Sequence, residues 1–169
     1  FNKIKTIKIT YKVNFCSLGI AKSMNKGIKM SSKPWILILH SGDYIIKNKA
    51  NYKKIKERLS LASNKSINIF GSIYKSESGL VSYSNHHRKK IRSLKSPWVP
   101  HQSTFVHRTI YEHYIYDCQI KSAMDYEFFL RCYFAGIKFI TWPEYITIYQ
   151  LGGESSDVFQ SVCDVYNAL

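Results

Sequence analysis

The run Trp35-Ile-Leu-Ile-Leu39 is the feature that most restricts the fold of this chain. Five consecutive apolar residues are typical of a strand covered on both faces, as in a parallel sheet with helices on each side. Pro34 precedes the run, and the polar loop His40-Ser41-Gly42-Asp43 follows it. A membrane span would need about 20 apolar residues. The run therefore predicts an α/β sheet with a polar loop at the end of a strand, where such sheets bind ligands.

Helical and strand patterns alternate along the chain, and no repeat or low-complexity linker interrupts residues 1–169, so we expect a single domain. Apolar spacing predicts helices at Ile20–Ile28, Tyr52–Ala62, Thr109–Tyr114, Ser122–Gly136 and Asp157–Leu169. Further strands are expected at Lys3–Val13, Ile67–Tyr74, Leu80–Tyr83, Ser103–His107, Lys138–Trp142 and Tyr145–Tyr149.

The chain is strongly basic, with 25 Lys and Arg against 11 Asp and Glu and a net charge of +14. This balance favours an anionic partner, such as nucleotide phosphates, lipid headgroups or nucleic acid. The alternative is that the lysines only solvate helix faces, since they are dense only between His86 and Lys95. The four cysteines form no Cys-x-x-Cys pair, and the first residues show no signal-peptide pattern. Free thiols in a reducing cytoplasm are therefore expected.

Two acidic residues are candidates for chemistry. Asp43 could hold a divalent cation that bridges a diphosphate, or it could close its own turn by accepting backbone N–H bonds. Asp125 could serve as a general base toward a hydroxyl, or it could cap the helix that Ser122 begins. The sequence pattern leaves both alternatives open at both positions.

The pair His101-Gln102 follows two prolines and could hydrogen-bond a hydroxylated ligand. His101, His107 and His113 recur every six residues, which matches no zinc signature. The sequence contains neither a Gly-x-x-x-x-Gly-Lys phosphate loop nor a Gly-x-Ser-x-Gly elbow. The residues by themselves indicate a basic α/β domain that handles phosphate.

Three segments together resemble family 2 glycosyltransferases of the bacterial surface-polysaccharide kind. Gly19-Ile-Ala-Lys-Ser-Met-Asn-Lys-Gly-Ile28 resembles the family's Gly-Ile-Tyr-Asp-Ala-Met-Asn-Lys-Gly-Ile helix. Trp35 to Asp43 resembles the apolar strand that ends in Leu-Asn-Ser-Gly-Asp, a divergent form of the Asp-x-Asp metal motif. The third segment runs from His101-Gln-Ser-Thr-Phe105 through Asp125-Tyr-Glu-Phe-Phe-Leu-Arg131 to Leu151-Gly-Gly-Glu-Ser-Ser156. The resemblance spans residues 14 to 156.

The resemblance implies a GT-A fold, a Rossmann-like mixed sheet flanked by helices. It also implies inverting transfer of a sugar from a nucleotide-diphosphate sugar to a hydroxyl of a glycan or lipid-linked acceptor in cell-surface polysaccharide synthesis. Asp43 would bind Mn²⁺ or Mg²⁺, and Asp125 would deprotonate the acceptor. The residues expected near the donor are Asn25, Lys26, Ser41 and Gly42, and those expected near the acceptor are His101, Gln102, Tyr126 and Glu127.

The family's opening strand-helix-strand, which holds the nucleobase, has no counterpart here. The resemblance therefore implies the C-terminal two-thirds of a GT-A domain, N-terminally truncated. Ser17-Leu-Gly19 and Ala21-Lys-Ser23 also depart from the family pattern on the donor side. A catalytically inactive remnant that only binds is one alternative, and a basic nucleic-acid-binding domain, for which no motif is present, is another. The basic charge and the apolar face of 157–169 predict a place at the inner face of the cytoplasmic membrane.

Overall fold

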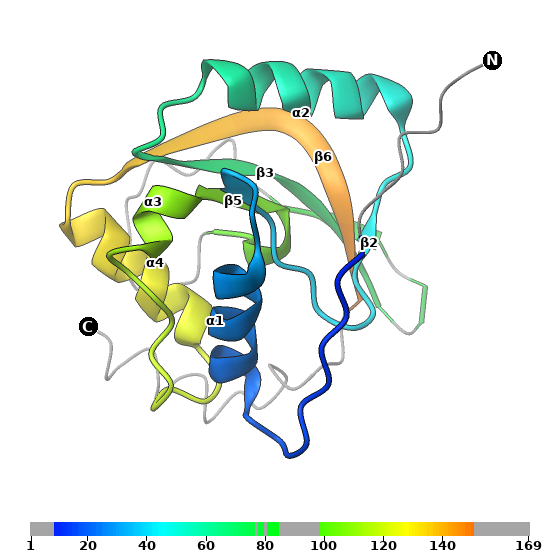
Figure 1. Cartoon of the computed structure of the whole chain (residues 1–169). Helices are drawn as coiled ribbons and strands as arrows, with labels where there is room; N and C mark the ends of the chain where they lie inside the picture. Colours follow the sequence, from blue (N-terminus) through cyan, green and yellow to red (C-terminus); the bar gives the residue numbers. More distant parts are fainter. Residues whose placement is uncertain (1–8, 77, 80, 85–98, 151–169) are drawn as a thin grey trace.

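The computed structural model describes residues 9–76, 78–79, 81–84 and 99–150. Its strands are β1 (Trp35–Ile36), β2 (Tyr44–Ile45), β3 (Ser66–Lys75), β4 (Val81–Tyr83), β5 (Thr104–His107) and β6 (Lys138–Gln150). Its helices are α1 (Ile20–Met30), α2 (Lys49–Leu61), α3 (Arg108–Tyr111) and α4 (Met124–Phe134), with a 3-10 turn, η1, at His101–Ser103. The strands form one mixed sheet in the order β1-β5-β3-β6-β2, with β4 beside β3. Figure 1 shows α2 on one side of this sheet and α1, α3 and α4 on the other, which confirms the predicted α/β architecture.

The strand β3 is the centre of the sheet and of the fold. Its first seven residues are all buried, and it pairs with β4 and β5 in antiparallel and with β6 in parallel orientation. This central position was not evident from the sequence, because β3 contains the polar residues Ser66, Asn68 and Ser72, which are nevertheless buried. Their hydrogen bonds compensate for burial, as when Asn68 accepts from the Trp142 indole at 2.9 Å.

The prediction that residues 35–39 form a strand covered on both faces, as in a parallel sheet, is wrong. Only Trp35 and Ile36 are in a strand, and that strand lies at the sheet edge, antiparallel to β5. Leu37 and Ile38 are partly buried, and Leu39 is exposed. The apolar run therefore covers one face of the core, while nothing in the described residues pairs with its outer edge.

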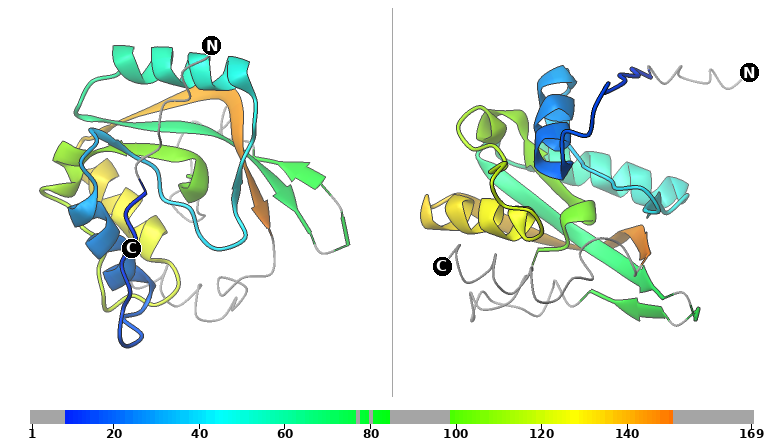
Figure 2. Two further views of the ribbon diagram at one scale, coloured as in Figure 1. Left: turned by 45° about the vertical axis from the view of Figure 1, so that its right-hand side comes forward. Right: turned by 90° about the horizontal axis from the view of Figure 1, so that it is seen from below.

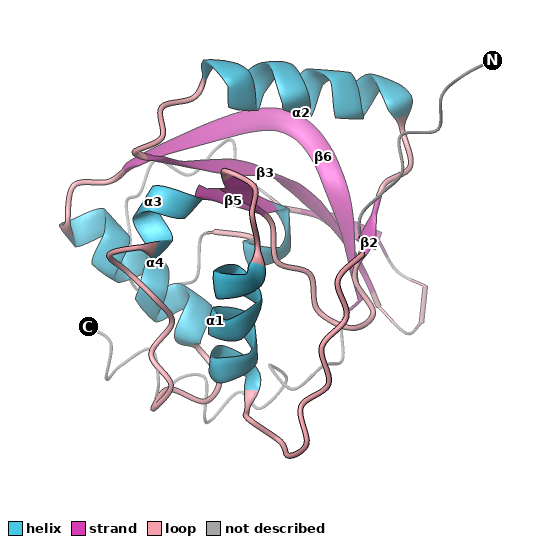
Figure 3. Cartoon of the chain, viewed as in Figure 1, coloured by secondary structure: helices cyan, strands magenta, loops and turns pink. Residues whose placement is uncertain are grey.

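The two strands predicted between Lys138 and Tyr149 are one continuous strand, β6. Ile69 faces Thr141 whereas Gly71 faces Tyr145, so β6 carries extra residues around Pro143. Proline removes a ladder hydrogen bond, and a bulge at that point lets the strand bend without ending. The bend of β6 under α2 is visible in Figures 1 and 3.

The main core lies between the sheet and the helices α1, α3 and α4 (Figure 2). The helix α1 buries Ala21, Met24, Asn25 and Ile28, which follows the predicted spacing. The helix α4 begins at Met124, with Ala123 as its N-cap, two residues later than predicted, and Gly136 at φ +75° follows its end. In this core, fully buried side chains of α4 pack with those of β3, including Phe128, Cys132 and Ile67.

The strand predicted at Lys3–Val13 is absent from its described part, residues 9–13. Ile9 and Tyr11 are 85% and 84% exposed, because no described strand offers a partner to this segment. Cys16, Cys118 and Cys132 are free, as predicted. The basic block 86–95, the closing segment 151–156, the expected tail helix 157–169 and Cys163 lie outside the described residues. Within the described part, no helix has the length and apolarity needed to cross a bilayer.

Candidate functional site

The loop that carries Asp43 is a tight turn held by its own carboxylate. The Asp43 N–H donates to the His40 carbonyl at 3.1 Å, and the His40 N–H donates to Asp43 Oδ2 at 3.0 Å. Gly42 has φ +93°, a conformation that favours glycine. Partial burial raises the pKa of Asp43, and the hydrogen bond from His40 opposes this shift. The turn-closing role of Asp43 is thus real, and it occupies one carboxylate oxygen.

Asp125 lies in the first turn of α4, where the helix dipole favours a negative charge. Its Oδ1 accepts the N–H of Tyr126 at 2.8 Å. Burial lowers the pKa of His101 and raises that of Tyr116, and the Asp125 charge opposes the first shift and adds to the second. The first turn of a helix holds such a carboxylate in a defined position, as a group that contacts a ligand requires.

His101 is the most unusual polar side chain of this region. It is only 6% exposed, and neither ring nitrogen has a hydrogen-bond partner in the part of the chain that the structure describes. Burial lowers its pKa to about 4, although the charge of Asp125 acts in the opposite direction. The ring is therefore neutral at pH 7, with one nitrogen that donates and one that accepts. A ligand hydroxyl or a water, which can both donate and accept, satisfies such a ring.

Aromatic rings enclose His101 on several sides. The His40 ring stacks on it, with centroids 5.2 Å apart and planes inclined by 22°. Tyr116 and Phe129 meet it edge-on at centroid distances of 6.0 and 6.4 Å. The backbone of His40 holds Asp43, and its ring contacts His101. Asp43 is thus joined to the buried imidazole of His101 through one residue.

No role for His40 or Tyr116 was predicted from the sequence. His40 stands inside the segment that carries the family resemblance, at the position of the family's asparagine. Tyr116 is one of several nearby tyrosines, and no spacing singles it out. Burial raises the pKa of Tyr116 well above its usual value, so its hydroxyl stays protonated beside that of Tyr111, at 3.2 Å.

A buried set of hydroxyl groups anchors η1, the turn that presents His101 and Gln102. Ser103 Oγ donates to the Phe70 carbonyl at 2.8 Å, and Ser72 Oγ donates to Ser103 Oγ at 2.9 Å. Ser72 Oγ also shares a hydrogen bond of 2.9 Å with Thr147 Oγ1. These bonds tie the turn to β3 and β6, so the position of His101 is set by the centre of the sheet.

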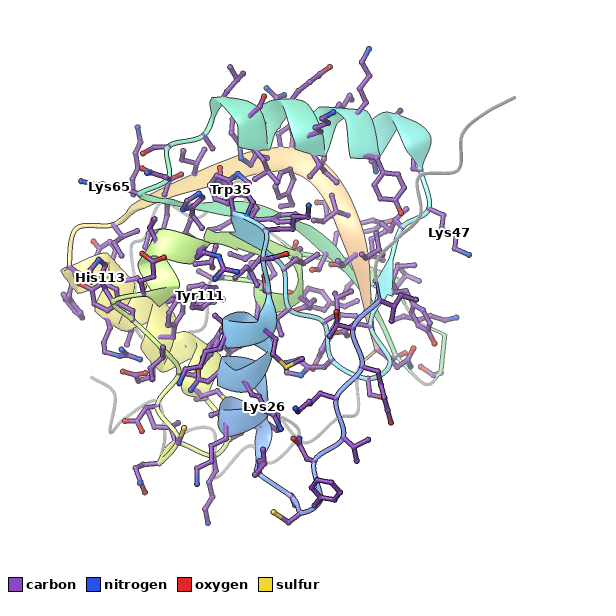
Figure 4. All side chains as sticks on the ribbon, in the orientation of Figure 1. Lys26, Trp35, Lys47, Lys65, Tyr111 and His113 are labelled. Atoms are coloured by element: carbon purple, nitrogen blue, oxygen red, sulfur yellow. The ribbon has the colours of Figure 1, made fainter. Side chains whose placement is uncertain are left out.

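Two residues predicted to lie near the donor have internal contacts instead. The Asn25 amide donates to the Tyr116 carbonyl at 2.8 Å and accepts the Tyr116 N–H at 3.0 Å. The Lys26 ammonium donates to Asn14 Oδ1, and Figure 4 shows Lys26 on the outer side of α1. A donor contact for either residue stays a prediction that these bonds do not favour. Ser41, by contrast, lines an open cavity, and Gly42 neighbours it in the turn.

Among the residues predicted near the acceptor, Gln102 and Tyr126 are buried, and the Tyr126 hydroxyl has no partner in the described part of the chain. Glu127 is paired with Arg131, whose second nitrogen lies 2.8 Å from the carboxylate. Arg131 also donates to the Ile115 carbonyl at 2.6 Å. The Glu127 carboxylate therefore stabilises the chain before α4, and its predicted acceptor contact remains untested.

An open cavity of about 1320 Å³ lies between α1 and the edge of the sheet, next to His40 and Ser41. Its walls are formed by residues 14–19, by side chains of α1 and by residues 35–41, and they include neither Asp43 nor His101 nor Asp125. The described lining includes Lys22, Lys33 and Lys121 and no acidic residue. A cavity with this lining suits a ligand or a segment that combines apolar surface with negative charge.

The described residues contain no group of three His, Cys, Asp or Glu side chains that could hold a metal ion. Asp43 offers a single carboxylate, with one oxygen already bonded to the His40 N–H. Magnesium is commonly held by one or two carboxylates together with water and substrate phosphates. The residues present thus fit a cation that arrives with a diphosphate, and they do not form a metal site of their own.

Comparison with known proteins gives a structural answer. Neither the protein-family models nor the curated protein sequences match the chain. Solved structures of TarS from S. aureus, a glycosyltransferase, do match. The TM-score is 0.60 at 14% identity for TarS, 0.60 at 12% for TarS 1-349 in complex with UDP, and 0.59 at 13% for TarS 1-349.

The chain has a glycosyltransferase-like fold. The likeness covers 89% of this chain, and it covers 26%, 45% and 51% of the three TarS chains. The chain thus spans about a quarter to a half of the length of these structures. At such low identity the comparison shows the fold, and the chemistry has to be argued from the site.

Proposed function

We propose that this chain belongs to a glycosyltransferase that moves a sugar from a nucleotide-diphosphate sugar to a hydroxyl of a glycan or lipid-linked acceptor, with inversion. The observation that carries the proposal is the stacking of His40, whose N–H holds the Asp43 carboxylate, on the buried His101 ring. The adjoining cavity has lysines and no acidic residue in its described lining, which suits a diphosphate. One of the TarS structures holds UDP, which supports a nucleotide donor.

In this proposal Asp125 accepts the proton of the acceptor hydroxyl. The acceptor oxygen forms a bond to the anomeric carbon while the bond from that carbon to the diphosphate breaks, and attack from the opposite face inverts the centre. The neutral His101 ring holds a hydroxyl near Asp125. Asp43 would hold Mn²⁺ or Mg²⁺ on the diphosphate, and the cation would neutralise the charge of the leaving group.

We also propose that this chain forms the C-terminal two-thirds of a GT-A domain. The donor nucleobase would then be held by a part of that domain other than residues 1–169. Two observations support this. The outer edge of β1 pairs with no described strand, and the apolar cavity lies beside it. Further strands could add at that edge and cover the exposed Leu39.

The enzymatic proposal is tested by a screen of nucleotide sugars, beginning with UDP sugars, with and without Mn²⁺ or Mg²⁺. Release of the nucleoside diphosphate is the readout. We expect Asp125→Asn and Asp43→Ala to abolish turnover, and Asp43→Ala also to remove the response to the metal. Asp117→Asn, in an exposed loop, is the matched control and should leave the rate unchanged. Full activity in Asp125→Asn would reject the assigned base.

A second candidate, an inactive binding piece, is favoured by the internal bonds of Asn25 and Lys26. It predicts that UDP binds in calorimetry while no nucleotide sugar in the screen is turned over. The two candidates therefore differ in turnover and agree in binding.

We propose that the protein works at the inner, cytoplasmic face of the cytoplasmic membrane. The support is the helix α2, whose Lys53, Lys54 and Lys56 are exposed, and anionic lipid attracts such a surface by about 1 kcal/mol per basic residue. Figure 4 shows Lys47 and Lys65 beyond the two ends of the same helix. Flotation with vesicles of phosphatidylcholine and phosphatidylglycerol should enrich the protein.

The triple change to glutamate at Lys53, Lys54 and Lys56 should remove the enrichment. The same change at Lys22, Lys29 and Lys33, which lie in or beside α1 across the sheet, is the control and should preserve it. Equal loss in both triple variants would show that only total charge matters. No enrichment of the unchanged protein would remove the membrane proposal.

A further inference from the structure

We propose that His40 is a positioning residue of this site, whose ring fixes the orientation of the buried His101 imidazole and through it the hydroxyl that His101 binds. The proposal rests on the proposed function for its kinetic consequence and on the stacked ring pair for its structural one. His40 has no role in the family pattern, where an asparagine stands at its position.

The first argument is the hydrogen-bonding state of His101. A buried polar group without a partner is costly, and native proteins seldom keep one without a reason. His101 has two unpartnered ring nitrogens among the described residues, and it is 6% exposed. No hydrogen bond within the described part of the chain sets the rotation of this ring. Its orientation must come from packing, which here means the rings that enclose it.

The second argument concerns which of the enclosing rings sets the plane of the His101 ring. Tyr116 and Phe129 are buried in the core, and Tyr116 is also fixed through both backbone hydrogen bonds to Asn25. Both meet His101 with ring edges, at interplanar angles of 63° and 61°. His40 supplies the nearly parallel contact, and its side chain is exposed. Among these three rings, His40 is therefore the one that lies nearly parallel to the plane of His101.

The third argument is the double attachment of His40. Its N–H donates to Asp43 Oδ2, while its ring lies on His101. One residue thus joins the loop of Asp43 to the ring of His101. Because proximity effects depend on small displacements, loss of the ring should lower turnover although no reacting group is removed.

Side-chain substitutions separate the two attachments, since the N–H of His40 persists in each of them. In His40→Ala the stack is lost, and we expect kcat to fall about 10- to 100-fold, in line with the cost of about 1 Å of misplacement. In His40→Phe a flat ring remains, and most of kcat should return. The binding of UDP should stay within about twofold in both variants. His113→Ala, at an exposed histidine outside the site (Figure 4), is the matched control.

Nuclear magnetic resonance of the histidine rings tests the structural half without any need for turnover. The His101 ring protons should shift in His40→Ala, because the ring current of His40 and the fixed ring plane are lost, and they should stay close to their original region in His40→Phe. The His113→Ala substitution should leave the chemical shifts of the His101 ring protons unchanged.

The outcomes are distinguishable. If the unchanged chain transfers no sugar, the proposed function fails, and the histidine ring spectra alone then test whether His40 orients His101. Unshifted His101 signals in His40→Ala overturn the positioning role. Shifted signals with an unchanged kcat overturn it too, while they leave the transferase proposal standing. A kcat that falls equally in His40→Ala and His40→Phe shows that imidazole chemistry, not ring position, is what the site needs.

Discussion

His101 is deeply buried, and neither of its ring nitrogens has a hydrogen-bond partner among the described residues. The sequence pointed to His101, Asp43 and Asp125 through motifs, and in the structure His40 joins Asp43 to His101. The sequence could not point to His40, because a ring stack between residues 61 positions apart leaves no local pattern. It also suggested Asn25 as a donor contact, whereas tertiary packing uses that amide to hold Tyr116.

The protonation of His101 gives a prediction about stability and pH. Its pKa is lowered to about 4 in the folded state, against 6.5 for the free side chain. The unfolded chain therefore binds more protons between these values, and the free energy of unfolding should fall as the pH is lowered from 7 toward 4. From pH 7 to pH 5 the contribution of this group is about 2 kcal/mol.

Urea unfolding at the two pH values measures this difference, and His101→Phe should remove most of it. The subtraction matters because the pKa of His107 is also lowered by burial and that of Asp43 is raised. An equal pH dependence in the two proteins would contradict the assigned neutral state of His101.

At the scale of elements, the helices and the strands β3, β4, β5 and β6 were predicted near their observed positions, whereas the place of residues 35–39 in the sheet was not. Helix periodicity is read from the segment itself, and α1, α2 and α4 appear where it placed them, with shifts of a few residues at their ends. Strand positions depend on partners that are distant in sequence. The apolar run 35–39 became an edge, and the polar-containing β3 became the centre, because buried hydroxyls and amides found partners there.

The hydroxyl cluster beneath η1 can be tested by Ser103→Ala. Removal of Ser103 Oγ deprives Ser72 and the Phe70 carbonyl of a partner in a buried place, and this should cost about 1–3 kcal/mol of unfolding free energy. Ser82→Ala, on the exposed strand β4, is the control and should change stability by less than about 0.5 kcal/mol. Equal effects in chemical denaturation would mean that the cluster does not anchor the turn.

At the scale of the whole molecule, the outer edge of β1, which pairs with no described strand, and the cavity beside it are the main departure from a closed fold. An unpaired edge with apolar neighbours promotes association between chains. Leu39→Lys should therefore raise the concentration at which the protein begins to aggregate, measured by light scattering. Leu61→Lys, on α2, is a matched control, since Leu61 is 81% exposed and Leu39 is 36% exposed. A larger gain from Leu61→Lys would contradict the assignment of this edge.

The central claim is that Asp43 and Asp125 serve one site, with a cation and a diphosphate between them. Paramagnetic Mn²⁺ broadens the resonances of nearby nuclei, so a titration of the protein with Mn²⁺ and UDP, followed by amide spectra, tests it directly. The account predicts broadening at Gly42 and at Tyr126, none at Lys65 or His113, and no broadening in Asp43→Ala. Broadening at Gly42 with a sharp Tyr126 signal would place the two carboxylates in separate sites and contradict the account.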